Sequence, residues 1–450
     1  MNTPPRILWW TAGLISFAAL TVLVHRYVSL NVYALMFPEE GTVRITDFIY
    51  HLIIVKAFWA GEITTIYGFE AQKAAIDAFF GREAHFVMPV AVTPTALVLW
   101  LPFVLAARVD VALASTLWVS ASLALLAVGL VKSGAFLVAR ERGAFGILIV
   151  AMIIIMTSFL MQLAISLGQG SLMACGAMLL MFAEMMEAGK AGRPIRKWLV
   201  LPLVLLLSLK MPYAAAGIML LLIFGYVYEA VLSAALLLLS VASLVLVFGP
   251  GLLTDWFAQC ALYLEPGLPE GYIQLAFFRQ STFRAAYAPL LGDGAAAGIS
   301  ETVVIAGGLV SGLLALARHL HPRARTVLNE RLTERQHAVA FFALLLLFLP
   351  YLGISEDLLL MVPFVIAHPV SGGGGGGGDR SFFNVKGAAV CICLFLILNY
   401  HLWHLYQYLW LLWFVKVGVL SYLYLAAGRA AGGPGEGGGG RPLAENRNRV

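Results

Sequence analysis

Residues 229–249 read EAVLSAALLLLSVASLVLVFG, with one acidic residue at the start and apolar or small side chains after it. An α-helix needs about 20 such residues to cross the hydrocarbon core of a bilayer. The run lacks the alternation of a barrel strand, and a helix satisfies all of its backbone polar groups internally. Similar runs recur along almost the whole chain. They predict an all-α, polytopic helical membrane protein.

The composition supports the same class, because 61% of the 450 residues are hydrophobic and 12% are charged. Such a chain is not a soluble globular protein. We expect about 12–13 transmembrane helices in one domain, 1–428, followed by a flexible glycine-rich tail, 429–450. The expected location is the cell's inner (plasma) membrane. The predicted spans are 7–25, 88–106, 111–136, 145–165, 170–187, 198–209, 211–226, 229–249, 301–317, 336–353, 355–370, 387–403 and 405–427.

The net charge is +5, and the positive residues are concentrated in particular loops. This pattern indicates a signal for membrane topology rather than a surface that binds nucleic acid. The basic loops 190–197, 318–335 and 379–386 are expected in the cytoplasm. Residues 250–300, the Gly168–Gln169 turn and Ser355–Asp357 then lie on the outer face.

Two arguments about the membrane side of Asp47 disagree. Counting the predicted spans back from the cytoplasmic basic loops places Asp47 on the cytoplasmic side. A cytoplasmic N-terminus followed by a single helix places it on the outer side. One span is therefore wrongly divided. The two suspected stretches are 198–226, which would be a single broken helix around Lys210, and 111–143. The short N-terminal flank of the first helix favours an outer Asp47.

Two long segments, 26–87 and 250–300, lie between spans and are predicted to form caps on the outer face. The first contains an apolar stretch that begins at Asp47 and ends near Gly61. We expect an interfacial helix here, with Asp47 at its N-cap and glycine at its end. The second mixes aromatic and charged residues with Gly/Pro turns.

Several short motifs resemble, in order and spacing, the polyprenyl-phosphate-dependent glycosyltransferases of family 87. The resemblance covers roughly residues 44–250. Its motifs are Asp47-Phe48-x-Tyr50 followed by Gly61 and Tyr67, Thr93-Pro94 with Leu97 to Pro102, the Gly168-Gln169 turn, and Lys210-Met211-Pro212. Two departures, Thr93 for one of a pair of prolines and Met211 between the lysine and the proline, leave the subgroup and the sugar open.

The resemblance implies the GT-C helical fold, an active site at the outer membrane surface, and an acidic residue of the first outer loop as base. It also implies a hexosyl- or pentosyltransferase that uses a polyprenyl-phosphate sugar donor and a lipid or glycan acceptor. Mannose is the best single guess for the sugar, and arabinofuranose or another pentose is the alternative. Inverting transfer needs one carboxylate to take the acceptor proton and cations to stabilise the leaving phosphate. No cofactor is required.

Asp47 is the candidate general base. The alternative is that it only caps the helix that begins at Phe48, by accepting backbone N–H bonds. The two roles can coexist.

Lys210, between two apolar runs, is the first candidate cation for the phosphate, and its alternative role is to snorkel to the headgroups. Arg279 and Arg284 are further candidates. Either would otherwise contact acidic lipids or pair with Glu265 or Glu270.

The remaining candidates are polar or aromatic groups expected at the outer face. Gln169 would bind sugar hydroxyls, or its turn would cap the following helix. Glu356 and Asp357 would bind acceptor or sugar, or act as helix N-terminal acids. Tyr50 and Tyr67 would stack on sugars, or serve as interfacial aromatics.

No metal site is predicted, since the pair His401-x-x-His404 lacks an accompanying carboxylate. The four cysteines are expected to be packing residues. The competing function is a transporter or flippase of lipid-linked glycan intermediates, which usually has ionisable groups at mid-membrane depth and paired repeats. A non-catalytic assembly subunit is a third possibility.

Overall fold

The computed structural model describes residues 47–81, 87, 90, 92–138, 158, 161, 164–165, 168–262, 282–349, 354–367, 395 and 411–429. The predicted span 7–25, nearly all of 145–165 and 387–403, Arg279 and the tail beyond residue 429 lie outside the described residues. Within the described part, helices make up almost all of the regular structure, which confirms the all-α fold class.

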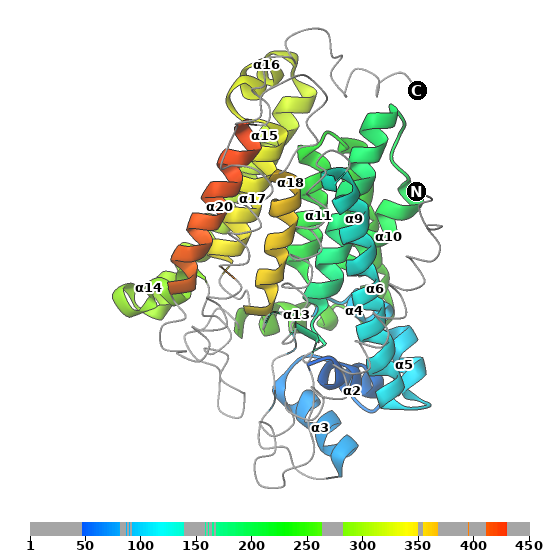
Figure 1. The fold of residues 1–450 in the computed structure, drawn as a ribbon. Coiled ribbons are helices and arrows are strands. Elements are labelled where there is room, and N and C mark those ends of the chain that lie inside the picture. The colour runs from blue at the N-terminus through cyan, green and yellow to red at the C-terminus, as the bar shows by residue number, and fades with distance from the viewer. Residues whose placement is uncertain are drawn as a thin grey trace.

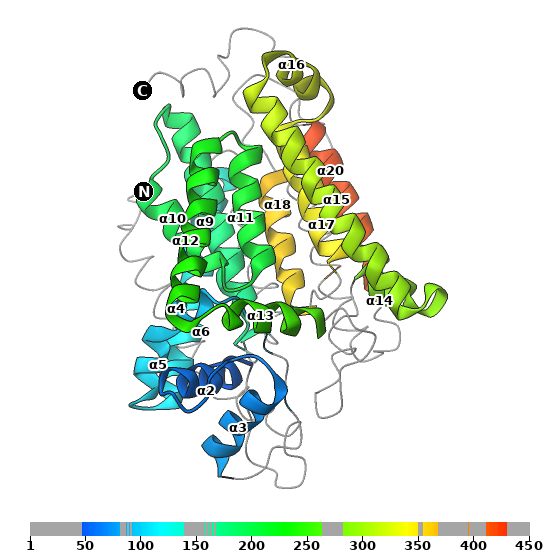
Figure 2. The same cartoon turned by 180° about the vertical axis from the view of Figure 1, so that it is seen from behind.

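Long helices run side by side in a bundle, and short helices lie at both of its ends (Figures 1 and 2). In chain order the elements are α2 (Asp47–Trp59), α3 (Phe69–Phe80), α4 (Ala96–Leu99), α5 (Leu101–Ala107), α6 (Val111–Val138), α9 (Gly170–Ala191), α10 (Lys197–Leu207), α11 (Met211–Ile223), α12 (Val227–Phe248), α13 (Gly251–Leu262), α14 (Phe283–Leu291), α15 (Asp293–Leu320), α16 (Pro322–Arg331), α17 (Glu334–Phe348), the 3₁₀ helix η3 (Ile354–Leu360), α18 (Met361–Ala367) and α20 (Leu411–Arg429).

Five described helices are long and apolar enough to span a membrane, within α6, α9, α12, α15 and α20. In α9, 78% of the most apolar window is buried, whereas in α12 the share is 11%. Helix α9 is therefore the centre of the bundle, and α12 turns most of its apolar surface outward, as a lipid-facing helix does.

Helices α6 and α9 approach each other closely because glycines face each other. A Cβ atom added to Gly176 would lie 2.5 Å from the backbone nitrogen of Leu126, and one added to Gly129 would lie 2.6 Å from the carbonyl oxygen of Gly176. Small residues of this kind let membrane helices pack backbone to backbone.

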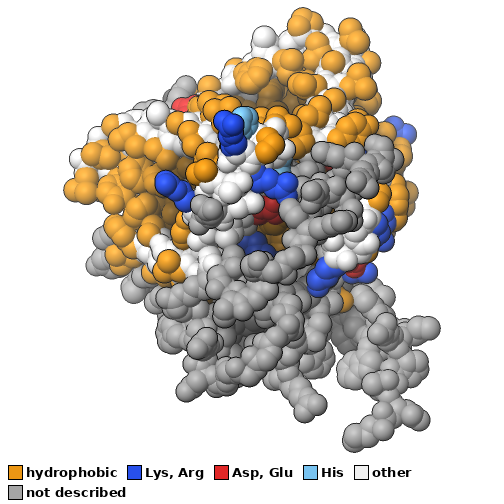
Figure 3. Space-filling model, turned by 90° about the horizontal axis from the view of Figure 1, so that it is seen from above, with side chains coloured by type: hydrophobic (Ala, Val, Ile, Leu, Met, Phe, Trp, Pro, Cys, Tyr) orange, Lys and Arg blue, Asp and Glu red, His pale blue; other side chains and the backbone are white. Residues whose placement is uncertain are grey.

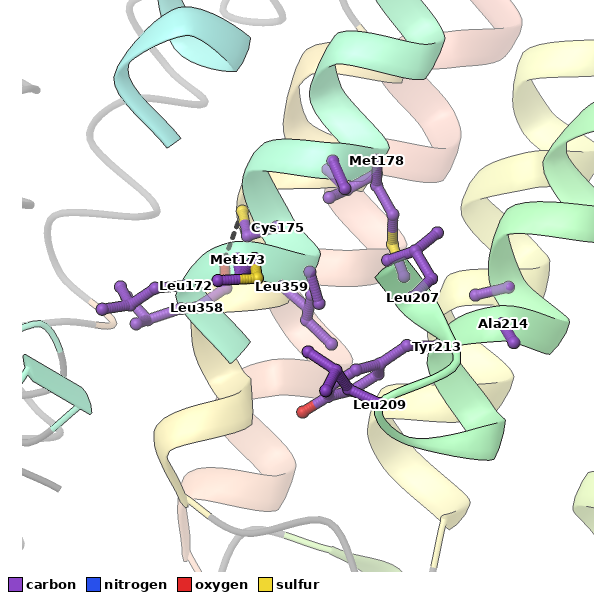
Figure 4. Packing of buried hydrophobic residues seen from close by; sticks show 14 of the residues in the cluster. Leu172, Met173, Cys175, Met178, Leu207, Leu209, Tyr213, Ala214, Leu358 and Leu359 are labelled. Carbon is purple, nitrogen blue, oxygen red and sulfur yellow. Dashed lines mark hydrogen bonds between the residues drawn. The ribbon is translucent and has the colours of Figure 1, made fainter. Parts of the chain in front are cut away.

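On its other sides, α9 packs against the α10–α11 pair and η3 (Figure 4). Met178 points toward Leu207 of α10, and the Cys175 thiol donates to the carbonyl oxygen of Leu358 at 3.6 Å. Cys175 is thus a packing residue.

The predicted spans 198–209 and 211–226 correspond to two short helices, α10 and α11, joined at Ser208–Lys210. They lie side by side in the bundle, and a Cβ on Gly217 of α11 would contact Leu207 of α10. The suspicion that 198–226 is one broken helix is therefore wrong.

The predicted span 88–106 is also wrong. Its described part forms α4 and α5, which together are too short to cross a bilayer. Both lie at the same end of the bundle as α2, because the Trp59 indole of α2 donates to the carbonyl oxygen of Leu97 at 3.2 Å. Helix α6 starts at this end (Figure 1). Without this crossing, the count of spans back from the cytoplasmic loop 190–197 places Asp47 on the outer side.

The bundle has two chemically different ends. One, called here the α2 end, carries α2 to α5, α13, α14 and the Gly168–Gln169 turn; the other, the α16 end, carries α16 and the α9–α10 connection (Figures 1 and 2). A helix, α2, is present where the interfacial helix was predicted. Residues 293–300, predicted within the second outer segment, instead form the first turns of α15.

At the α16 end, the α9–α10 connection is fixed by Glu184, which is buried and accepts hydrogen bonds from Arg193 and Arg196. The two arginines also pair with Glu187. These basic residues therefore have a structural role in addition to any effect on topology.

The corrected topology predicts which residues are labelled from the same side of the membrane. Glu62→Cys and Val109→Cys, both at exposed positions of the α2 end, should react with a membrane-impermeant maleimide from one side. Arg323→Cys on α16 should react from the other. The measurement uses sided vesicles and a background without the native cysteines. Labelling of residues 62 and 109 from opposite sides would restore the crossing at 88–106.

Candidate functional site

Asp47 and Gln169 meet at the α2 end. Asp47 is the first residue of α2, and the side-chain nitrogen of Gln169 donates to its Oδ2 atom, although the two residues are 122 positions apart in the chain. Both side chains are half-buried. The structure therefore brings together two residues that the sequence singled out separately.

The turn that carries Gln169 requires glycine at position 168. Gly168 has φ +63°, and a Cβ added to it would lie 2.5 Å from the Cβ of Phe48. The Trp118 indole of α6 donates to the Gly168 carbonyl oxygen at 2.8 Å. The turn is thus held by α6 while it touches the first turn of α2.

Aromatic rings form the floor of this junction. The Phe48 ring stacks on Trp118 with centroids 4.9 Å apart and on Trp100 with centroids 5.1 Å apart, and the Phe103 ring meets it edge-on. Sequence reasoning did not identify the two tryptophans, because each lies in an apolar segment with no pattern that indicates its partner.

His51, one turn after Asp47, is the main site residue that sequence reasoning missed. Its Nδ1 atom donates to the Asp47 carbonyl oxygen at 2.5 Å, and its ring meets Trp100 edge-on. Since the carbonyl oxygen can only accept, Nδ1 carries the hydrogen and Nε2 carries the lone pair. The available signal was the i to i+4 spacing from Asp47.

Burial keeps this histidine neutral. Desolvation lowers the pKa of His51 to about 4, the hydrogen bond to the Asp47 carbonyl acts in the opposite direction, and the positive charge of Lys210 lowers it further. Helix α2 lies outside the candidate membrane spans. The site therefore has a neutral acceptor, His51 Nε2, near a carboxylate.

Lys210 is the residue before α11, in extended backbone, with its ammonium 5.7 Å from the centre of the Tyr213 ring. Its positive charge contributes to the lowered pKa of His51. Ser208, two residues before Lys210 in the same connection, is anchored: the Thr95 hydroxyl lies 2.8 Å from the Ser208 hydroxyl, and the Thr93 hydroxyl donates to the Ser208 carbonyl oxygen.

Tyr50 and Tyr67 lie in the core rather than on an open surface. Both are fully buried, and the Tyr67 hydroxyl donates to the Val92 carbonyl oxygen at 2.9 Å. Burial raises the pKa of Tyr67 well above its ordinary value. In this conformation neither ring offers a face for a sugar.

Two other predicted residues, Arg284 and Asp357, form ion pairs with residues other than those of the Asp47 site. Arg284 of α14 is buried and pairs with Asp293, away from α2 in both views (Figures 1 and 2). Asp357 of η3 pairs with Lys416 of α20 at 2.7 Å. Glu356 belongs to η3, but its side chain lies outside the described part.

Among the described residues, no group of three His, Cys, Asp or Glu side chains is placed to hold a metal ion. Comparison of the chain with protein-family models, curated proteins and solved structures yields no significant match.

Gly168→Ala should disrupt the site. The substitution introduces a left-handed alanine, which costs about 1–2 kcal/mol, and a clash with Phe48. We expect a lower melting temperature in detergent. The control is Gly170→Ala, where the added Cβ makes only an ordinary contact at 4.0 Å with Leu209. Equal melting temperatures for the two variants would contradict the assigned contact.

His51 should make stability depend on pH. Its folded-state pKa of about 4 lies below the ordinary value of 6.5, so between these two values the unfolded chain binds a proton that the folded chain does not. Stability should therefore fall as the pH drops from about 6.5 to about 4. Thermal unfolding of His51→Gln should show a smaller loss over this range, while the exposed His321→Gln should follow the wild type. An unchanged slope in His51→Gln would refute the burial effect.

Proposed function

We propose that the protein is an inverting membrane glycosyltransferase that moves a sugar, mannose as the first candidate, from a polyprenyl-phosphate donor to a hydroxyl of a lipid or glycan acceptor. The observation that supports this most directly is the contact between Asp47 and Gln169. One end of the apolar helical bundle carries the Asp47 carboxylate, the Gln169 side-chain amide, which can bind sugar hydroxyls, and the Lys210 cation. The family 87 resemblance implies such a set of groups.

In this proposal Asp47 is the general base. The acceptor oxygen forms a bond to the anomeric carbon and its proton passes to the Asp47 carboxylate. The bond between that carbon and the phosphate oxygen breaks, and polyprenyl phosphate leaves with the electron pair. Lys210 stabilises the phosphate charge, which increases in the transition state.

Gln169 and His51 complete the binding chemistry. The amide of Gln169 holds the Asp47 carboxylate in orientation. The lone pair on His51 Nε2 can accept a hydrogen bond from a hydroxyl of a neutral sugar. Because the histidine is uncharged, this hydrogen-bond acceptor does not repel the nearby phosphate. The aromatic floor around Phe48 keeps this side of the site dry, which strengthens these interactions.

The charge distribution favours an outer location for the site. Basic residues are concentrated at the α16 end, which the positive-inside rule assigns to the cytoplasm. They are Lys190, Arg193, Arg196, Lys197, Arg318, Arg323, Arg325, Arg331 and Arg335. The α2 end then faces outward, where a lipid-linked donor is a suitable sugar source.

Asp47→Asn should reduce transfer by about 10²–10⁴-fold, the usual contribution of general acid–base catalysis. The assay measures sugar incorporation into lipid by purified protein given a synthetic polyprenyl-phosphate mannose. Asp77→Asn is the matched control, since this acid lies on α3 at the same end and pairs with Lys73 one turn earlier in the same helix. Full activity in Asp47→Asn would refute the base assignment.

A transporter of lipid-linked intermediates is the second candidate, and one observation favours it. Asp357 and Lys416 form an ion pair with both side chains fully buried among helices, and buried intramembrane charges often mark transport pathways. An assay of the purified protein in vesicles distinguishes the two functions. A transporter would translocate the lipid-linked sugar without transferring it, and this translocation would be lost in Lys416→Met but kept in Asp47→Asn.

A further inference from the structure

Arg318, at the end of α15 that meets α16, is a buried cation with incomplete hydrogen bonding. Its side chain is 1% exposed. Its Nη2 atom donates to the carbonyl oxygen of Leu332, while Nε and Nη1 have no hydrogen-bond partner among the described residues. A guanidinium has five N–H donors, so most of its capacity is unused.

The other buried cations show what is missing. In the described residues, Arg284 is paired with Asp293 and Lys416 with Asp357. Arg318 has no such carboxylate. Among the described residues, Glu334 is near enough to act on Arg318 electrostatically but forms no ion pair with it. Glu334 lies in the first turn of α17, where the helix dipole stabilises an acidic residue without Arg318.

The surroundings of Arg318 are mostly positive or neutral donors. His319 makes a hydrogen bond of 3.0 Å to the Ile223 carbonyl oxygen, and the charge of Arg325 on α16 acts on the same cluster. His337 of α17 is buried; its Nε2 lies 2.8 Å from the Ser311 hydroxyl, and its Nδ1 has no partner. The charge of Arg318 acts on His337. This chemistry favours an anion.

We propose that Arg318 binds a phosphate group, that of an anionic phospholipid headgroup, between α15, α16 and α17. A charged donor that is buried and unsatisfied destabilises the fold, and a hydrogen bond to a phosphate oxygen removes that penalty. Phosphate also matches the forked geometry of a guanidinium.

A lipid is favoured over a soluble phosphate by the location. Helix α15 has only 17% of its apolar window buried, and Leu313 and Leu320, on either side of Arg318, are exposed as lipid-facing residues are. Figure 3, which looks onto the α16 end, shows Lys and Arg side chains spread over this face with hydrophobic side chains flanking them. Basic pockets between membrane helices on the cytoplasmic side commonly bind anionic headgroups.

The test compares melting temperatures of the full-length protein in detergent with added phosphatidylglycerol, phosphatidylcholine or inorganic phosphate. Phosphatidylglycerol should stabilise the wild type and phosphatidylcholine should not. Arg318→Met should weaken the apparent affinity for phosphatidylglycerol about tenfold or more, the effect of losing a charged hydrogen bond. Arg323→Met, an exposed arginine on α16, should bind like the wild type.

Without added lipid, Arg318→Met should be at least as stable as the delipidated wild type, because it removes an uncompensated charge. If Arg318→Met is instead destabilised without lipid and Glu334→Gln is destabilised equally, Arg318 is a structural partner of Glu334, and the proposal fails. It also fails if phosphatidylglycerol stabilises the wild type and Arg318→Met alike. Equal stabilisation of the wild type by inorganic phosphate would overturn the lipid assignment in favour of a soluble phosphate ligand.

Discussion

The docking of α2 on the Gly168–Gln169 turn is the contact on which the arrangement of the α2 end depends. Gly168 touches Phe48 so closely that no other residue fits without movement. Asp47 precedes Phe48 and Gln169 follows Gly168, so this one backbone contact places both polar side chains together. Trp118 fixes the turn from α6 and stacks on Phe48, which ties the junction to the membrane bundle.

A buried charge in a membrane bundle is costly unless it is compensated, and two buried ion pairs of this chain achieve that compensation by different means. Glu184 accepts from two arginines of the next connection, whereas Lys416 is matched by a single carboxylate, Asp357, and by the Leu346 carbonyl oxygen. These pairs fix how neighbouring helices sit, because breaking one would leave an unpaired charge in a medium of low polarity. Charge pairing therefore contributes to the specificity of helix packing as well as to topology.

Much of the fold could be predicted from the sequence, since long apolar runs leave few alternatives to membrane helices. The boundaries of α9 and α12 and the helix at Asp47 follow from such runs and from glycine and acid at their ends. The prediction of a span at 88–106 was wrong because an apolar sequence indicates that a helix is buried, but not whether it crosses the membrane. Helices α4 and α5 are apolar because they pack on α2 and α6. The junction at Phe48 needs contacts across the chain, and no local pattern indicates them.

The same reason limits how well the site could be predicted. Asp47 and Gln169 were found as polar residues in otherwise apolar surroundings, but the role of His51 depends on its tautomer, which is set by a hydrogen bond to backbone. Its neutrality has two physical causes, burial and the nearby Lys210 charge. In the proposed mechanism a neutral His51 can accept a hydroxyl proton at Nε2, which a protonated ring cannot do, and Lys210 supplies the positive charge for the phosphate.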